Sequence, residues 1–229
     1  IKTDMCTRSR KESDIISNHD ALNEISMTQG VSILSERDPD LASIVNAYGP
    51  PPLWQRPQGF STLLYIILEQ QVSLASARAT YGKLSECLPE ISPSYFIELD
   101  DQTLKQVGFS RQKTEYTRIL ANAILDGRLN LDHLATMDDQ SVLNTLTTLK
   151  GIGPWTAKVY LLTALLRPDV WPTGDLALVL AIQHKKHLKK PPLADHLQRI
   201  GQLYKPLRSV AARLYWWSYL EGKSQDEKE

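Results

Sequence analysis

The stretch Leu149-Lys150-Gly151-Ile152-Gly153-Pro154-Trp155-Thr156-Ala157 decides the fold of this chain. It separates a helical pattern from Asp138 to Leu146 and an apolar helical pattern from Trp155 to Leu166. Two glycines one residue apart permit a sharp turn and a close approach of another molecule to the backbone. Pro154 suits the first position of a helix, and a helix N-terminus attracts anions. The stretch predicts a helical hairpin that can bind a phosphate, and a plain turn between packed helices is the alternative.

Helical periodicity dominates the rest of the sequence, without the sustained alternation that is typical of strands. A short helix is expected from Asp38 to about Tyr48, and a long pattern runs from Phe60 to about Leu88. Between them, Gly49-Pro50-Pro51-Pro52 indicates an extended linker. Further helices are expected from about Asp175 to Gln183, at 194–202 and at 206–219. We therefore expect an all-α protein with roughly ten short helices.

Composition excludes several classes of protein. The 26 basic and 26 acidic residues balance, so nucleic acid could bind only at a local patch, such as the eight Lys/Arg between His184 and Arg213. Two cysteines are too few for a four-thiolate cluster and favour a reducing compartment. The histidines at 184, 187 and 196 lack the companions of a zinc site. The polar N-terminus and the short apolar runs predict a soluble, intracellular protein without a membrane span or secretion signal.

From Thr147 to Asp175 the sequence resembles the helix-hairpin-helix, Gly/Pro-rich loop and aspartate signature of DNA base-excision glycosylases. Within that superfamily it is most similar to the 3-methyladenine DNA glycosylase II family. Supporting segments are Leu68-Glu69-Gln70-Gln71-Val72-Ser73, Gly108-Phe109-Ser110-Arg111-Gln112-Lys113 and Lys205-Pro206-Leu207-Arg208-Ser209. The resemblance implies a two-lobed HhH-GPD fold with its active-site cleft between the lobes. It also implies a flexible lead at 1–18, one glycosylase unit at 19–222 whose hairpin and catalytic segment is 141–183, and a charged tail at 223–229.

Asp175 matches the catalytic aspartate of that family. Breaking an N-glycosidic bond makes the sugar cationic, and a fixed carboxylate stabilises that charge. The alternative is that Asp175 only caps a helix, and the two roles are compatible. Related enzymes with lyase activity carry a lysine nucleophile where this chain has Trp155, so simple hydrolysis to an abasic site is expected. Lys158 lies three positions further along the helix, so it does not occupy the position of that lysine nucleophile.

The resemblance also assigns binding residues, with ordinary packing or exposure as the alternative for each. Trp155, Trp216 and Tyr65 would line the pocket for the damaged base, since indole faces suit a cationic base. Gln71 would be the wedge that fills the gap left by the flipped base. Residues expected to contact DNA phosphate are Gly151, Gly153, Lys150, Thr156, Lys158, Ser110 and Lys113. Backbone carbonyls of Thr147, Leu149 and Ile152 would hold a structural K⁺ or Na⁺.

The resulting hypothesis is a monomeric, monofunctional glycosylase that removes 3-methyladenine and 7-methylguanine from double-stranded DNA in base excision repair. No cofactor is required for catalysis. We expect a cytoplasmic, nucleoid-associated location in a bacterium or a nuclear one in a eukaryote. Two alternatives stay open: a non-catalytic DNA-binding module, and a glycosylase for another lesion such as hypoxanthine or uracil. Departures from the family pattern, at Gly174, Val159 and Glu69, leave the range of lesions open.

Overall fold

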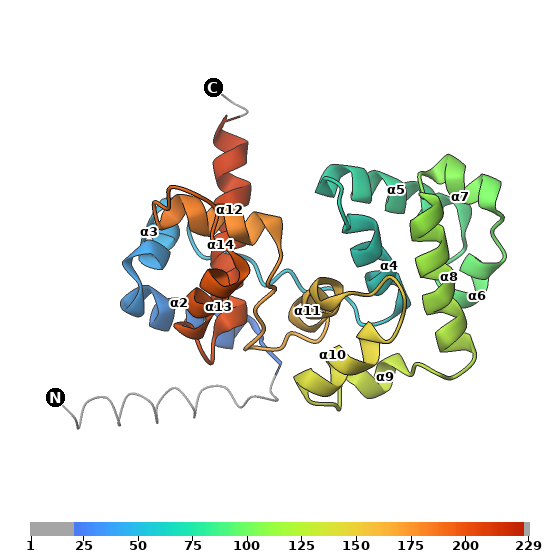
Figure 1. The fold of residues 1–229 in the computed structure, drawn as a ribbon, viewed down its shortest axis with the longest axis horizontal. Helices are drawn as coiled ribbons and strands as arrows, with labels where there is room; N and C mark the ends of the chain where they lie inside the picture. The colour runs from blue at the N-terminus through green and yellow to red at the C-terminus, as the bar shows by residue number, and fades with distance from the viewer. Residues whose placement is uncertain (1–20, 227–229) are drawn as a thin grey trace. The chain divides into compact units, whose positions relative to one another are not determined.

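The computed structural model describes residues 21–226, and side chains up to residue 223. This part of the chain forms α-helices and no strands (Figure 1), so the all-α expectation is confirmed. The chain divides into two compact units. The first combines the residues up to Trp54 with those from Leu166 onward, and the second runs from Gln55 to Leu165. The expected N-terminal lead at 1–18 and the last three residues of the tail lie outside the described range.

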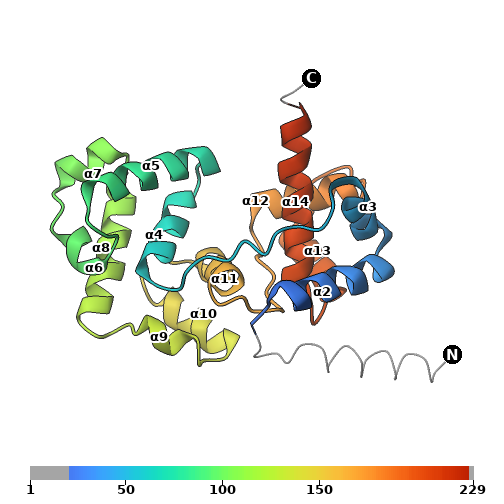
Figure 2. The ribbon, with the colours of Figure 1, turned by 180° about the vertical axis from the view of Figure 1, so that it is seen from behind.

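The first unit brings the two ends of the described chain together. The early helices, blue in Figure 1, lie beside the late helices, orange to red, and Figure 2 shows the same pairing from behind. Its helices are α2 (Glu24–Arg37), α3 (Pro39–Tyr48), α12 (Leu176–Lys185), α13 (Ala194–Gln202) and α14 (Arg208–Asp226). Helix α14 packs against α2, α3 and α12. Val210, Leu214 and Tyr215 on α14 are fully buried there, so this helix forms the centre of the unit's core.

Two helical segments of the first unit differ from the sequence expectation. Helix α2 was not expected, yet Asn23 starts it with a capping box: its Oδ1 accepts from the Ser26 N–H, and Ser26 Oγ accepts from the Asn23 N–H. Helix α14 continues to Asp226, beyond the expected end at Tyr219 and into the segment assigned to the tail. There Lys223 lies over the Tyr219 ring at 4.6 Å, an i, i+4 contact that supports the extra turn.

A polar network ties the α2–α3 junction to the C-terminal helices. The Asp38 carboxylate accepts hydrogen bonds from Lys186 Nζ at 3.0 Å and from the Tyr204 hydroxyl at 2.7 Å. Tyr204 also shares a 2.8 Å hydrogen bond with Tyr215, and Asp40 accepts a second bond from Lys186. Burial alone would raise the pKa of Asp38, but the bonds from Tyr204 and Lys186 outweigh it and lower that pKa.

This network predicts an acid-sensitive contribution to stability. A carboxyl whose pKa is lowered by folding contributes stability above its unfolded pKa of about 3.9 and loses it as pH falls through the folded pKa. We expect Asp38→Asn to lower the free energy of unfolding at pH 7 by about 1.5 to 3 kcal/mol, the usual worth of hydrogen bonds to a charged group. The difference from wild type should shrink below about pH 4. Urea unfolding at several pH values checks it, and a difference independent of pH would contradict it.

The second unit surrounds one apolar helix. Its helices are α4 (Phe60–Glu69), α5 (Leu74–Cys87), α6 (Pro93–Ile97), α7 (Asp101–Val107), α8 (Arg111–Leu125), α9 (Leu131–Leu134), α10 (Asp139–Thr147) and α11 (Pro154–Thr163). Helix α4 packs against α5, α8 and α11. Leu63, Leu64, Ile66 and Ile67 are fully buried, so the apolar residues of α4 form the centre of this unit's core.

The long pattern expected from Phe60 to Leu88 is two helices, so that expectation was wrong. The chain leaves the helical conformation at Gln70, and Gln71 has a φ of +58°, in the left-handed region. Ser73 then caps α5 by accepting from the Ser76 N–H at 3.2 Å. No glycine or proline marks this break, so hydrophobic periodicity alone did not predict it.

Among the described residues, no helix has both the length and the apolar character that a bilayer span requires.

Candidate DNA-binding and catalytic site

The hairpin between α10 and α11 needs glycine at one position more than at the other. Gly151 has a φ of +98°, and a Cβ added there would lie 2.1 Å from Cγ of Tyr116 on α8. Gly153 has an ordinary φ of −87°, and an added Cβ would meet nothing within 4 Å. Gly151 therefore allows the turn to form and pack, whereas Gly153 leaves open space at the exposed tip of the hairpin.

The N-terminus of α11 is free of side-chain capping. Gly153 occupies the N-cap position with no side-chain hydrogen bond, and Pro154 follows at the first helical position. Both residues are exposed. A helix start without a capping side chain, presented at an exposed turn, has the geometry of a phosphate-binding site. Phosphate binding at this helix start stays a prediction.

The charged and polar residues expected to contact DNA phosphate around the hairpin differ in their exposure and in their existing partners. Lys150 is exposed and forms an ion pair with Glu115 of α8, whose carboxylate raises the pKa of Lys150. The Thr156 side chain is buried, and its hydroxyl accepts a hydrogen bond from Gln70. Lys158 is half-buried on the next turn of α11. Lys150 is thus the most exposed of these groups, while Thr156 acts inside the unit.

Gln70 connects the turn between α4 and α5 to the hairpin. Its Nε2 donates to the carbonyl of Gly151 and to the hydroxyl of Thr156, both at 2.9 Å. The next residue, Gln71, is exposed and left-handed, which is rare for a residue with a side chain. The predicted wedge therefore lies at an exposed turn that Gln70 joins by hydrogen bonds to the predicted phosphate-binding hairpin. This bridging role of Gln70 was not predicted, because its partners lie more than 80 positions away in the sequence.

Ser110 and Lys113 lie at the start of α8 and have structural partners. The Ser110 side chain caps the helix by accepting from the Lys113 N–H at 3.2 Å. The ammonium of Lys113 donates to the carbonyl of Leu68 at 2.6 Å, and burial lowers the pKa of Lys113. Lys113 thus supports the end of α4, next to the predicted wedge.

Tyr65 lies in the second unit within a small cluster of polar and aromatic groups. The Arg56 guanidinium lies 4.9 Å from the centre of the Tyr65 ring, and the Tyr81 ring meets Tyr65 edge-on at 4.9 Å. Arg56 also forms a bidentate pair with the buried Glu69, at 3.0 and 2.7 Å. This pair neutralises Glu69, one of the departures from the family pattern. Because Arg56 covers one ring face, Tyr65 has less surface to offer a base than its sequence position indicated.

The predicted catalytic carboxylate belongs to the first unit. Asp175 is the N-cap of α12, and its Oδ1 accepts from the Leu178 N–H at 2.8 Å. The same oxygen accepts from the Trp216 indole N–H of α14 at 2.9 Å. Asp175 is 9% exposed, so its carboxylate is held rigidly in a largely buried position. It is therefore a helix cap, as the alternative held, and it is also fixed by an aromatic side chain.

Trp216 belongs to a cluster of three tryptophans. The Trp54 ring lies 6.4 Å from the Trp216 ring and 5.9 Å from the Trp217 ring, centre to centre. Trp54 has a φ of +48° and follows the proline-rich linker. No local pattern singles out Trp54, because a residue after a linker carries no signal that its side chain packs against a later helix. Trp155 is half-buried in the first turn of α11, in the other unit.

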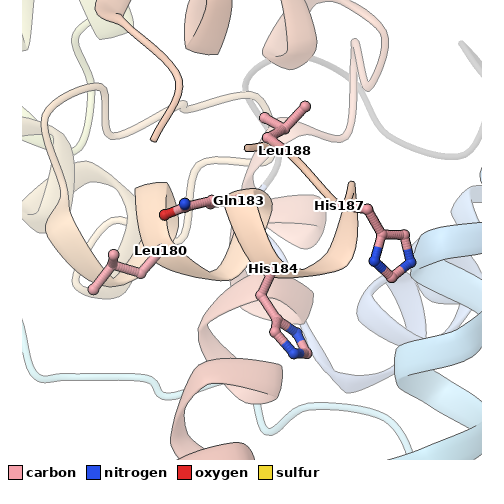
Figure 3. Close-up of a pocket in the computed structure, with 5 residues that line it drawn as sticks. All are labelled: Leu180, Gln183, His184, His187 and Leu188. Carbon is pink, nitrogen blue, oxygen red and sulfur yellow. The ribbon is translucent and has the colours of Figure 1, made fainter. Parts of the chain in front are cut away.

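The basic stretch from His184 to Arg213 is less available to DNA than its composition indicated. Lys186 pairs with Asp38 and Asp40, Arg208 pairs with Asp169, and Arg213 is fully buried. A depression of about 500 Å³ along α12 is lined by Leu180, Gln183, His184, His187 and Leu188. Figure 3 shows these five side chains. The imidazoles of His184 and His187 do not converge there, and the lining includes none of the predicted base-pocket residues.

Comparison with known proteins identifies the family. Residues 64–206 match the model of the HhH-GPD superfamily of base excision DNA repair proteins. This chain belongs to that superfamily. The hairpin, Asp175 and the turn with Gln71 all lie within the part of the chain that the family model covers.

Individual relatives have consistent names. A putative DNA-3-methyladenine glycosylase of Bacillus subtilis is 30% identical over 191 residues, which are 79% of this chain and 66% of that protein. DNA-3-methyladenine glycosylase 1 of Schizosaccharomyces pombe is 24% identical over 81% of this chain and 83% of its own.

Solved structures have the same fold. The S. pombe 3-methyladenine DNA glycosylase in complex with abasic DNA aligns with a TM-score of 0.76 and 23% identity, over 83% of this chain and 95% of its own. A DNA-3-methyladenine glycosidase of Bacillus halodurans aligns with a TM-score of 0.68 and 26% identity, over 87% and 91%. The first of these two structures is a complex with DNA.

Proposed function

We propose that this chain is a monofunctional DNA glycosylase that hydrolyses the N-glycosidic bond of alkylated purines in double-stranded DNA. The observation that carries the proposal is the Asp175 carboxylate, held by the Leu178 N–H and the Trp216 indole in a member of a base excision repair superfamily. The functional unit that we propose spans residues 19–222 and acts as a monomer, in the nucleoid of a bacterium or the nucleus of a eukaryote.

The proposed reaction depends on the Asp175 carboxylate. As the bond between the base and C1′ breaks, the electron pair leaves with the base and positive charge develops on the sugar. The Asp175 carboxylate stabilises that charge, orients the water whose oxygen joins C1′, and accepts the proton that this water loses. At about 4 Å and an effective dielectric near 20, the attraction is roughly 4 kcal/mol. This corresponds to about a thousandfold in rate, at about 1.4 kcal/mol per decade.

Alkylated purines are the substrates that fit this single catalytic group. A base such as 3-methyladenine or 7-methylguanine is already cationic in the nucleotide and leaves as a neutral molecule, so it needs no general acid. Indole rings stabilise a cationic base by stacking and by cation–π attraction. We assign this role to Trp216 and Trp155. The names of the relatives from B. subtilis and S. pombe support the same class of lesion.

The absence of a lysine nucleophile supports simple hydrolysis. Trp155 occupies the position at which related lyases carry the lysine that forms a Schiff base. An indole cannot form that intermediate. We therefore propose that the product is an intact abasic site, and that strand cleavage is left to another enzyme.

The DNA-binding surface that we propose centres on the hairpin. Phosphate would approach the uncapped start of α11 past Gly153, where an added Cβ finds open space. Gln71 would enter the duplex in place of the flipped base. We also propose that the carbonyls of Thr147, Leu149 and Ile152 bind a K⁺ or Na⁺ ion. Thr147 ends α10, where the last carbonyls lack partners within the helix. The Leu149 carbonyl accepts from the Ile152 N–H at 3.0 Å and has a second lone pair for the ion. Such an ion would supply charge between the hairpin and a DNA phosphate.

The test is release of damaged bases by the purified protein. We expect 3-methyladenine and 7-methylguanine to be released from methylated duplex DNA, leaving abasic sites that break only after alkaline treatment. Duplexes with a single hypoxanthine or uracil test the alternative lesions. Strand cleavage without alkali, or a covalent enzyme–DNA complex formed when borohydride reduces a Schiff base, would contradict the monofunctional mechanism. Tight binding to DNA with no base release from any substrate would instead support the non-catalytic module.

A further inference from the structure

Trp54 adopts a backbone conformation that its side chain does not favour. Its φ of +48° lies in the left-handed region, where residues with a Cβ are uncommon and bulky ones are outliers. Such conformations persist where the surrounding structure fixes them, and they gather at functional sites. The contacts around Trp54 therefore identify what this conformation achieves.

One face of α14 holds this segment in place. The Arg213 side chain is fully buried, and its Nε donates to the carbonyl of Leu53 at 2.8 Å. One turn further, the Trp217 indole donates to the carbonyl of Tyr48 at 3.1 Å and packs edge-on against the Trp54 ring. Arg213, Trp216 and Trp217 share a helix face because they are three and four positions apart. The linker before Trp54 is thus fixed at both ends, and its left-handed residue points the indole at α14.

The Trp54 ring meets the side chain that holds the carboxylate. Its centre lies 6.4 Å from that of Trp216, with the ring planes at 59°, and Trp216 donates its indole N–H to Asp175 Oδ1 at 2.9 Å. Trp216 is only half-buried, so packing from one side has to select its rotamer. Trp54 supplies that packing. A continuous series of contacts therefore runs from Arg213 through Leu53, Trp54 and Trp216 to Asp175.

We propose that Trp54 is a positioning residue for the Asp175 carboxylate and acts through Trp216. This inference rests on the proposed glycosylase function. Without the Trp54 ring, Trp216 loses the orientation that directs its N–H at Asp175, and the carboxylate loses one of its two identified donors. The effect is expected in the rate of the chemical step and not in the affinity for DNA.

Trp54→Ala and Trp54→Phe test the inference as a pair. Both substituents have a Cβ, so both keep the unfavourable backbone conformation, but only Phe keeps a ring against Trp216. We expect Trp54→Ala to lower the single-turnover rate of base release roughly 10- to 100-fold, as misplacement of a catalytic group does. Trp54→Phe should stay within about threefold of wild type, and affinity for abasic DNA should be nearly unchanged in both. Ile44→Val, in the buried core of the same unit, is the control for general loosening.

A double-mutant cycle separates positioning from direct contact with the base. If Trp54 acts through Asp175, adding Trp54→Ala to Asp175→Asn should change the residual rate less than about threefold, because coupled residues are not additive. If Trp54 stacks on the base, its full effect should persist in the Asp175→Asn background. That result would overturn the positioning role.

An NMR experiment tests the contact without relying on activity. The chain has five tryptophans, so its ¹H–¹⁵N spectrum holds five indole signals, and Trp216→Phe identifies that of Trp216. We expect Trp54→Ala to shift this signal and to speed its exchange with water, and Trp54→Phe to preserve it. An unchanged Trp216 signal in a folded Trp54→Ala protein would overturn the inference. A wild-type protein that releases no base would refute the proposed function instead, whatever the spectrum shows.

Discussion

Asp175→Asn should lower the rate of base release about a thousandfold, because it removes roughly 4 kcal/mol of attraction to the cationic sugar. The substitution isolates the charge. An asparagine Oδ1 can still accept from the Leu178 N–H and the Trp216 indole, which are 2.8 and 2.9 Å from the aspartate oxygen. The helix cap and the tryptophan contact should therefore survive. Single-turnover release of 7-methylguanine measures the effect.

Asp100→Asn is the matched control for this experiment. Asp100 caps α7 in the same way, accepting from the Thr103 N–H at 2.7 Å, but it lies in the other unit and outside the predicted site. We expect it to leave base release unchanged. If Asp175→Asn and Asp100→Asn behave alike, Asp175 is only a helix cap, and the chemistry that we assign to it is wrong.

Gly151→Ala should disrupt the hairpin, with the second largest effect. The new methyl would lie 2.1 Å from Cγ of Tyr116 and 2.5 Å from its Cβ, so shortening the tyrosine would not remove the clash. The left-handed φ of +98° adds a backbone penalty. Together, overpacking and backbone strain should lower the free energy of unfolding by about 3 kcal/mol. Urea unfolding measures this loss, and DNA affinity should fall with it because the start of α11 is displaced.

Gly153→Ala provides the comparison within the same turn. Its φ of −87° suits alanine and its added Cβ would meet no protein atom within 4 Å, so stability should stay within about 0.5 kcal/mol of wild type. Affinity for abasic DNA should nevertheless fall, because the methyl would stand where phosphate approaches the helix start. Unchanged affinity in Gly153→Ala would show that the hairpin tip does not contact DNA.

Local sequence was sufficient for the parts of the site that depend on neighbouring residues. The hairpin follows from Gly151 and Pro154, whose backbone preferences act within one turn. The capping position of Asp175 follows in the same way, because an N-cap bonds to an N–H only three residues away. Periodicity also gave the apolar helices around these segments. It failed at Gln70–Ser73, where a left-handed Gln71 splits one apparent helix into two without a glycine or proline.

The sequence by itself determined an all-α chain, the hairpin turn and a carboxylate at a helix start, because hydrogen bonds and backbone sterics within a few residues specify them. Only the tertiary structure decided what supports these features: Gln70 on the hairpin carbonyl, Tyr116 against Gly151, Arg56 on Glu69, and Trp54 against Trp216. Each of these contacts joins residues 13 to 162 positions apart. Packing within each unit selects these partners, and no local sequence pattern specifies which distant side chain will make the contact.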